Sequence, residues 1–177
     1  MYKRQVLSAG LVVVAAGAWS GRLAHTLGIR LPLLAGKGYA VDYEPSASPL
    51  RIPLYLHDER CVANPMGSRL RVTGGVILGT AEQGGDPRRV RAIRRAATVF
   101  GVGAEPRLEW SGLRPCTPDG LPAVGRHPRA ERVLFATGHG MLGVTLGPLT
   151  GRLVADLAAG RPEPPALTSL SPGRFET

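Results

Sequence analysis

The chain has 177 residues, of which 44% are hydrophobic and 20% charged, a balance that excludes a disordered protein and predicts a globular fold with a core. Its 24 glycines and 16 prolines predict many turns and short elements and disfavour a helical bundle. The 22 basic against 13 acidic residues suggest a polyanion-binding surface, but only Lys3 and Lys37 are lysines and most arginines are scattered, so we expect no nucleic-acid partner.

The first twenty residues allow two interpretations. Lys3 and Arg4, the apolar stretch 6–16 and the small residues that follow imitate a signal peptide. The β-branched run 11–15, stopping at Gly17, is instead typical of an interior parallel strand. These residues alone slightly favour the signal peptide. No stretch of the chain reaches the roughly 20 apolar residues of a membrane span.

The segment from residue 20 to residue 56 predicts a short helix and then extended chain. Ser20 is a candidate N-cap of a helix that runs to Leu27 and ends at Gly28. Residues 31–56 are interrupted by prolines, and alternation in the first part predicts a strand with Tyr39, Val41 and Tyr43 on one face.

The next segment predicts strands and an amphipathic helix. Two β-like runs, 70–73 and 76–78, surround Gly74-Gly75, which marks a hairpin turn or a bulge. Asp86-Pro87 then starts a helix that ends at Gly101. Its apolar positions recur at helical spacing, and we expect its arginines to lie on the solvent side: Arg88, Arg89, Arg91, Arg94 and Arg95.

The C-terminal third predicts a loop, a strand, a glycine-rich turn and a helix. Residues 110–122 are rich in turn formers, and residues 133–136 form a second buried strand. The glycine-rich stretch 137–143 leads to a helix over 148–159, with an apolar stripe of Leu149, Leu153, Val154 and Leu157. We expect the proline-rich tail from residue 162 to pack loosely.

Two patterns in this third suggest binding chemistry. A strand, a glycine-rich turn and a helix over 133–159 suit an anionic or electron-rich group, because glycines permit close approach and a helix N-terminus offers free N–H groups. The stretch lacks both the Walker ending and the acidic partner of a dinucleotide fingerprint. Arg114, between Gly112 and Pro115, is a candidate carboxylate clamp. An ion pair between Arg114 and Asp119 is an equally good interpretation.

Longer motifs carry a resemblance to a known family. Residues 110–125 (WSGLRPCTPDGLPAVG) and 136–157 (ATGHGMLGVTLGPLTGRLVADL) resemble the C-terminal signature of the D-amino-acid oxidase superfamily of FAD-dependent oxidoreductases. Within it, the likeness is greatest to D-amino-acid dehydrogenase small subunits and next to glycine oxidases. Residues 12–20 resemble the family's strand that returns to the FAD domain, and 37–39 and 79–82 resemble further landmarks in the same order. This order favours an internal strand over a signal peptide at 6–20.

The resemblance implies the fold class. We expect α/β plus α+β architecture: an incomplete FAD-binding Rossmann-like domain with an inserted antiparallel-sheet substrate domain. Residues 1–31 would belong to the FAD domain, 32–110 would form the substrate-binding domain, and 111–177 would complete the FAD domain. The family's N-terminal βαβ unit, which holds the ADP half of FAD, is not among these residues. We therefore predict a fragment of a larger enzyme that is inactive and binds FAD weakly by itself.

The resemblance also implies site residues. Arg114 would hold the substrate carboxylate, and Tyr39 and Tyr55 are candidates for lining the substrate pocket. The FAD contacts would come, largely through backbone, from Gly17, Gly138, His139, Gly140, Met141, Leu142, Gly143, Val144 and Thr145. The imidazole of His139 is expected to be a positioned neighbour of the flavin. We nominate no acid–base residue and no metal ligand.

The implied reaction is amino-acid catabolism: hydride transfer from a D-amino acid to FAD gives an imine, which water hydrolyses to a keto acid and ammonia. The implied partners are the amino acid, an electron acceptor (quinone or oxygen) and the N-terminal FAD-binding segment. A glycine or sarcosine oxidase fragment is an alternative, and so is a secreted basic module that binds polyanions. The resemblance implies a cytoplasmic location, with attachment at the inner membrane face as a variant.

Overall fold

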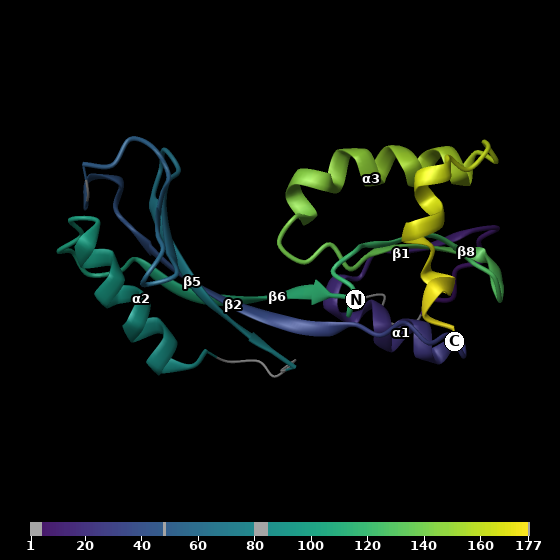
Figure 1. The fold of residues 1–177 in the computed structure, drawn as a ribbon, viewed down its shortest axis with the longest axis horizontal. Coiled ribbons are helices and arrows are strands. Elements are labelled where there is room, and N and C mark those ends of the chain that lie inside the picture. Colours follow the sequence, from purple (N-terminus) through teal and green to yellow (C-terminus); the bar gives the residue numbers. More distant parts are fainter. Residues whose placement is uncertain (1–4, 48, 80–84, 177) are drawn as a thin grey trace. The chain divides into compact units, whose positions relative to one another are not determined.

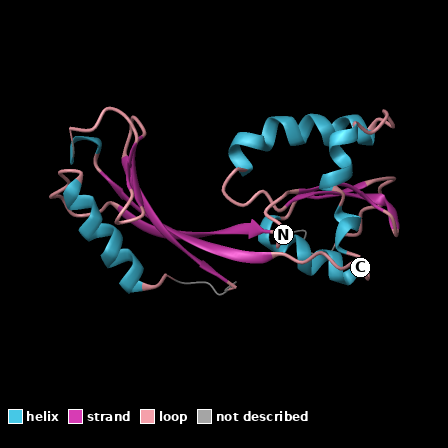
Figure 2. Ribbon diagram, viewed as in Figure 1, coloured by secondary structure: helices cyan, strands magenta, loops and turns pink. Residues whose placement is uncertain are grey.

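The chain forms two compact units in a computed structural model that describes residues 5–47, 49–79 and 85–176. One unit comprises Met1–Leu34 and Arg114–Thr177, and the other comprises Ala35–Leu113 (Figures 1 and 2). The first unit thus comes from two stretches separated in sequence, and the second lies in between. No helix among the described residues is long and apolar enough to cross a membrane.

The first unit contains a three-stranded sheet in the order β1-β8-β7. Its strands are β1 (Val12–Val14), β7 (Ala123–His127) and β8 (Ala130–Thr137). Strand β1 pairs with β8 in parallel, and β7 pairs with β8 antiparallel. The predicted strands at 11–15 and 133–136 are both confirmed. The first is not interior, however: Val12 and Val13 are 50% and 44% exposed, because β1 stands at one edge of this sheet.

Helices lie on both faces of this sheet. Leu134 and Phe135, adjacent on β8 and both fully buried, contribute to different cores because successive strand side chains point to opposite faces. Phe135 packs with residues in and after α1 (Ser20–Thr26), and Leu134 packs with Leu157 of α3 (Gly143–Ala158). Figure 1 shows the two helices on either side of the sheet.

The start of α1 differs from the prediction. A short 3₁₀ helix, Gly17–Trp19, runs directly into α1, so the N-cap position falls on Trp19 and has no side-chain bond. Ser20 therefore lies inside the helix, where its Oγ is buried without a hydrogen-bond partner. The predicted end is confirmed: Gly28 has a φ of +72°, a conformation that favours glycine.

Helix α3 begins five residues earlier than the sequence predicts. It starts at Gly143, with Pro148 inside it. The Leu146 N–H donates to the Leu142 carbonyl at 2.8 Å, so the first turn closes before the proline is reached. A proline at this depth removes one helical bond and leaves the other bonds of the first turns intact. Of the predicted stripe, Leu157 is buried, but Leu149 is 59% exposed.

The C-terminal tail is docked, contrary to the prediction of loose packing. It forms two 3₁₀ helices, Pro165–Leu170 and Pro172–Phe175. Leu167 is buried in the core beside Leu134. Prolines start both short helices, so they pre-set the backbone angle there and do not loosen the tail.

The second unit contains a five-stranded sheet in the order β3-β4-β5-β2-β6. Its strands are β2 (Leu34–Tyr43), β3 (Leu54–Leu56), β4 (Cys61–Pro65), β5 (Leu70–Leu78) and β6 (Leu108–Cys116). The pairs β2·β5, β3·β4 and β4·β5 are antiparallel. A 3₁₀ turn, Pro45–Ala47, follows β2.

The glycine pair in β5 forms a bulge. Gly38 pairs with Val76 and Tyr39 with Gly74, so Gly75 is the extra residue, at a φ of +67°. Of the two predicted alternatives, the bulge is confirmed and the hairpin turn is wrong.

Helix α2 (Pro87–Val99) packs on one face of this sheet through Ile93, Ala96 and Ala97. Its predicted N-cap is confirmed, since the Asp86 side chain accepts a hydrogen bond from the Arg88 N–H at 2.9 Å. Four of its five arginines are exposed and Arg94 is half-buried, which confirms that most of the arginine cluster faces solvent.

The predicted loop at 110–122 is largely wrong. Residues up to Cys116 belong to β6, and a tight turn follows in which the Gly120 N–H donates to the Thr117 carbonyl at 3.3 Å. The strand borders only β2 in this sheet. An edge strand tolerates Gly112 and Pro115, which read as turn residues in the sequence.

Candidate functional site

The candidate site lies in the first unit, at the carboxyl ends of β1 and β8. These two strands are parallel, so the segments that leave them emerge at the same edge of the sheet, where ligands of α/β folds bind. The Thr137 hydroxyl, at the end of β8, donates to the Gly17 carbonyl after β1 at 3.1 Å. Gly17 has a φ of +56°, a conformation that favours glycine. This hydrogen bond holds the two segments together.

The glycine-rich turn after β8 is fixed by close packing. A Cβ on Gly138 would lie 2.7 Å from Thr117 Cγ2 and 3.2 Å from the Ala123 nitrogen, and the φ of this residue is +81°. Both facts require glycine. The Gly140 N–H donates to the Pro115 carbonyl at 2.9 Å, and Cys116 and His139 form an isolated antiparallel bridge. The turn is therefore fastened to the end of β6.

The N-terminus of α3 is open and surrounded by apolar side chains. Its N-cap residue, Leu142, makes no side-chain capping bond, and the first turn has no acidic residue. The first N–H groups of a helix and its positive dipole end favour an electron-rich group. Met141, Leu142 and Val144 are 79%, 56% and 95% exposed. An apolar ring system with an electron-rich edge matches this combination.

His139 is held by the helix that follows it. Its Nε2 lies 2.9 Å from the Thr150 Oγ1. Burial lowers the pKa of this imidazole below its ordinary value of 6.5, because the charged form loses solvation. The side chain is therefore neutral at neutral pH. This state agrees with a positioning role, and the role itself stays a prediction.

Arg114 provides the charged side chain of the candidate site. It lies near the end of β6, two residues from the bridge to His139. Its Nη1 is buried and has no hydrogen-bond partner among the described residues. Buried polar atoms are normally satisfied, so such a nitrogen calls for a partner such as a bound ligand.

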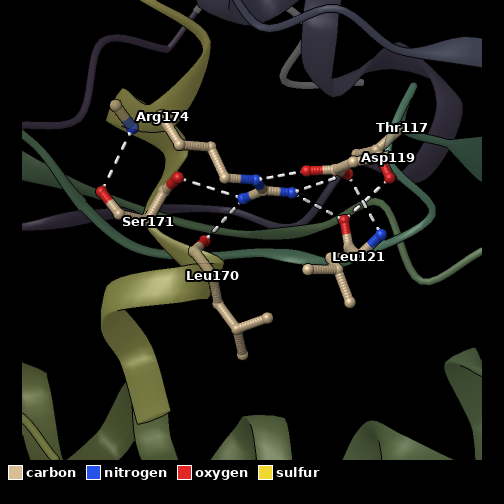
Figure 3. Close-up of polar contacts among 7 residues, drawn as sticks. Thr117, Asp119, Leu121, Leu170, Ser171 and Arg174 are labelled. Carbon is tan, nitrogen blue, oxygen red and sulfur yellow. Dashed lines mark hydrogen bonds and ion pairs between the residues drawn. The ribbon is translucent and has the colours of Figure 1, made fainter. Parts of the chain in front are cut away.

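The alternative in which Arg114 pairs with Asp119 is wrong, because Asp119 is bound by the C-terminal tail. The Arg174 Nε donates to Asp119 Oδ2 at 2.7 Å and its Nη2 to Oδ1 at 3.1 Å (Figure 3). These bonds from Arg174 lower the pKa of Asp119 to about 2. The same guanidinium donates to the carbonyls of Leu121, Leu170 and Ser171 at 2.8, 2.9 and 3.0 Å. The tail thus fixes the turn at 117–121, which follows Arg114 in the chain.

The two nominated tyrosines lie in the second unit and are not brought together. Tyr39, on β2, is 3% exposed in the core beneath α2. It borders a pocket of about 500 Å³ that is also lined by residues of α2 and β6. Tyr55, on β3, is 59% exposed and stacks edge-on against His57. Two strands separate β3 from β2 in the sheet. Their role in substrate binding stays a prediction.

Sequence reasoning missed the residues that brace the site: Thr117, Thr137, Thr150 and Arg174. Thr137 directly precedes the glycine turn, and its position at a strand end could have marked it. Thr150 stands eleven residues after His139, beyond the predicted helix start, so no local pattern indicated it. Arg174 contacts Asp119 across 55 positions. Among the described residues no group of His, Cys, Asp and Glu is arranged to hold a metal ion.

The sequence comparison shows the class of protein, which is a flavin-dependent oxidoreductase. Residues 3–157 match the family model described as FAD dependent oxidoreductase (DAO), and the chain belongs to this family. The glycine turn and the uncapped helix fit the isoalloxazine part of FAD, since the helix start has no side-chain cap and Met141, Leu142 and Val144 are exposed and apolar.

Individual relatives agree with this assignment. The chain is 37% identical over 169 residues to a D-amino acid dehydrogenase of Paramagnetospirillum magneticum, covering 92% of this chain and 40% of that protein. It is 36% identical to a glycine oxidase of Bacillus subtilis, covering 82% of this chain and 40% of that protein. The crystal structure of glycine oxidase from Geobacillus kaustophilus superposes with a TM-score of 0.83 at 31% identity, covering 95% of this chain and 46% of that one. The chain thus spans about 40% of the length of these curated relatives.

Proposed function

We propose that this chain supplies the flavin-ring and substrate-carboxylate side of an enzyme that oxidises the C–N bond of D-amino acids. The family assignment supports FAD-dependent oxidation, and a D-amino acid dehydrogenase among the relatives supports the substrate class. The proposal concerns the whole enzyme, of which this chain corresponds to about 40%.

The observation that carries the proposal is the unpartnered Arg114 nitrogen beside the glycine turn. Arg114 and the turn belong to the same unit, and the bond from the Gly140 N–H to the Pro115 carbonyl joins their backbones directly. A guanidinium binds both oxygens of a carboxylate at once. A carboxylate held here places the α-carbon of an amino acid near whatever the turn binds.

The residues of the site would orient and polarise, while FAD supplies the redox chemistry. Bound FAD would supply the hydride acceptor for oxidation of the substrate C–N bond, and the product would be an imine that water hydrolyses to a keto acid and ammonia. The N-terminus of α3 would stabilise negative charge that develops on the bound ring system. Neutral His139, held by Thr150, would place no positive charge there. The electron acceptor would be a quinone or oxygen.

A glycine or sarcosine type of amine oxidase is the second candidate. The superposition on the Geobacillus kaustophilus glycine oxidase and the identity to the Bacillus subtilis enzyme favour it. The two candidates share the carboxylate clamp and differ in the room for a side chain on the α-carbon. Relative rates with D-alanine, glycine and sarcosine would separate them.

The edge of β1 is the proposed contact for the N-terminal FAD-binding segment. Val12 and Val13, on opposite faces of this short strand, are both about half exposed. Parallel sheets are normally covered on both faces. A further parallel strand with its helices, taken from the part of the relatives that this chain does not span, would cover both residues and hold the ADP half of FAD.

A chimera tests the proposed function. The N-terminal part of the Paramagnetospirillum magneticum relative, which this chain does not span, would be joined to residues 1–177. We expect bound FAD and oxidation of D-alanine with an artificial electron acceptor. Arg114→Gln should lower kcat/KM by about 10- to 100-fold, because a hydrogen bond to a charged group contributes about 1.5–3 kcal/mol.

The matched control is Arg132→Gln, which changes an exposed arginine of the same unit. FAD content should be equal in both variants, since Arg114 is assigned to the substrate. A chimera that contains FAD, yet oxidises D-alanine equally well with and without Arg114, would refute the clamp. A chimera that contains FAD and oxidises none of the three amines would refute the proposed reaction.

A further inference from the structure

A cluster of ionic side chains lies on the sheet of the second unit. Asp42 on β2 stands opposite Arg71 on β5 and is 4% exposed. The Arg71 Nε and Nη2 each donate to one of its carboxylate oxygens at 2.7 Å. The hydrogen bond from Arg71 lowers the pKa of Asp42, so the carboxylate stays charged. Arg71 also lies over the ring of Trp110, 4.8 Å from its centroid.

Arg69 makes the longer of the two ion pairs with Asp42 in this cluster. Both oxygens of Asp42 are occupied by Arg71, and Arg69 Nε reaches the nearer one only at 3.7 Å. This Nε is buried and has no hydrogen-bond partner among the described residues. An unsatisfied buried donor on a charged group is costly, and a bound anion would satisfy it.

Arg107 adds a third cation to the cluster. Its Nε lies 3.0 Å from Glu44 Oε1, and its Nη1 donates to the Ser68 carbonyl at 3.3 Å. Three guanidinium groups, of Arg69, Arg71 and Arg107, therefore face the two carboxylates of Asp42 and Glu44. Among the described residues of this cluster, one positive charge has no counter-charge.

A cavity is bordered by Arg69 and Arg107. It has a volume of about 360 Å³ and is lined by Asp42, Ser68, Arg69, Arg107 and Leu108. The volume accommodates a molecule with a carboxylate or phosphate group. Asp42 also borders the cavity, but its two oxygens are bound by Arg71, which offsets its repulsion of an anion.

We propose that this cavity binds a small oxyanion, a carboxylate or a phosphate group, between Arg69 and Arg107. The guanidinium fork matches both kinds of oxyanion, and Ser68 borders the same cavity. The site belongs to the second unit, whereas Arg114 and the glycine turn belong to the first. The proposal therefore uses none of the residues of the proposed flavin site and does not depend on the proposed function.

The test follows the Nε–H groups of arginine by nuclear magnetic resonance in the 177-residue chain. Inorganic phosphate and acetate are titrated at constant ionic strength, and a titration with sodium chloride provides chloride as the reference anion. We expect a saturable shift of the Arg69 Nε–H signal. Arg107→Gln, at a half-exposed position, should weaken binding by about tenfold or more, because it removes one charged partner.

The matched control is Arg51→Gln, at an exposed arginine of the same unit whose side chain donates to the carbonyls of Pro49 and Leu50. This variant should bind as tightly as the unaltered chain. If phosphate binds more tightly than acetate, the ligand group is a phosphate, and if acetate binds more tightly, it is a carboxylate. Both results support the site. A shift that never saturates, an equal shift with chloride, or equal weakening in Arg51→Gln would overturn the proposal.

Discussion

Replacing Arg174 with glutamine removes the cation that holds the C-terminal tail against the turn at 117–121. Arg174 donates to both oxygens of Asp119 and to the carbonyls of Leu121, Leu170 and Ser171 (Figure 3). It therefore joins the tail and the turn at a single point. We expect Arg174→Gln to destabilise the first unit and Asp119→Asn to destabilise it less.

The expected size follows from the pKa of Asp119 and the remaining hydrogen bonds. A drop from 3.8 to about 2 corresponds to an upper bound of about 2.4 kcal/mol. Asp119 is 36% exposed, so solvent screening reduces this to about 1–1.5 kcal/mol. The carbonyl bonds of Arg174 add about 1 kcal/mol. We expect losses of about 1–1.5 kcal/mol for Asp119→Asn and about 2–2.5 kcal/mol for Arg174→Gln.

Urea unfolding followed by circular dichroism measures both losses. Because the folded-state pKa of Asp119 is lowered, the pair stabilises the fold fully above pH 3.8 and loses this contribution as the pH falls through about 2. The difference in unfolding free energy between the unaltered chain and Asp119→Asn should shrink as the pH falls from 3.8 to about 2. Equal unfolding free energies at neutral pH, or a difference that persists at pH 2, would refute this reasoning.

Three further predictions concern the turn, a helix cap and the histidine. Gly138→Ala should cost about 2–3 kcal/mol, because it combines a positive φ with a close approach to Thr117; Gly10→Ala, with open space around it, should change little, and equal thermal unfolding of the two variants would contradict the packing. Asp86→Ala should cost about 1 kcal/mol by removing the cap of α2, whereas Asp86→Asn retains an acceptor and should be nearly neutral; calorimetry that finds the two variants alike would disprove the cap. In a proton NMR titration the His139 ring should gain its proton below pH 6.5, and Thr150→Val should keep the pKa low because burial is its cause; a pKa at or above 6.5 in the unaltered chain would contradict this.

Local patterns predicted those elements whose signals lie within a few neighbouring residues. The cap at Asp86 and the helix end at Gly28 depend on one backbone conformation and one side-chain bond, and both were identified correctly. The β-branched run 12–14 and the apolar run 133–136 form the expected strands. The motifs at 110–125 and 136–157 also indicated the family, because ordered motifs over such a length are specific.

Errors arose where a local signal was weaker than a tertiary contact. Gly112 and Pro115 read as a loop, yet pairing beside β2 makes them part of β6. The error at Pro148 is different and local: proline favours the first turn of a helix, but the bond from the Leu146 N–H to the Leu142 carbonyl begins α3 earlier. The prolines of the tail read as loose packing, yet Leu167 is buried and Arg174 binds Asp119.

The sequence left one choice open at the site, namely whether Arg114 pairs with Asp119. Both residues lie in one short segment, and spacing alone allows the pair. The fold brings Arg174 to Asp119 from 55 positions away, and this second arginine occupies both carboxylate oxygens. The Arg114 Nη1 has no hydrogen-bond partner among the described residues. Local conformation is encoded by neighbouring residues, but which cation lies beside Asp119 is decided by distance in space, which only the folded chain sets.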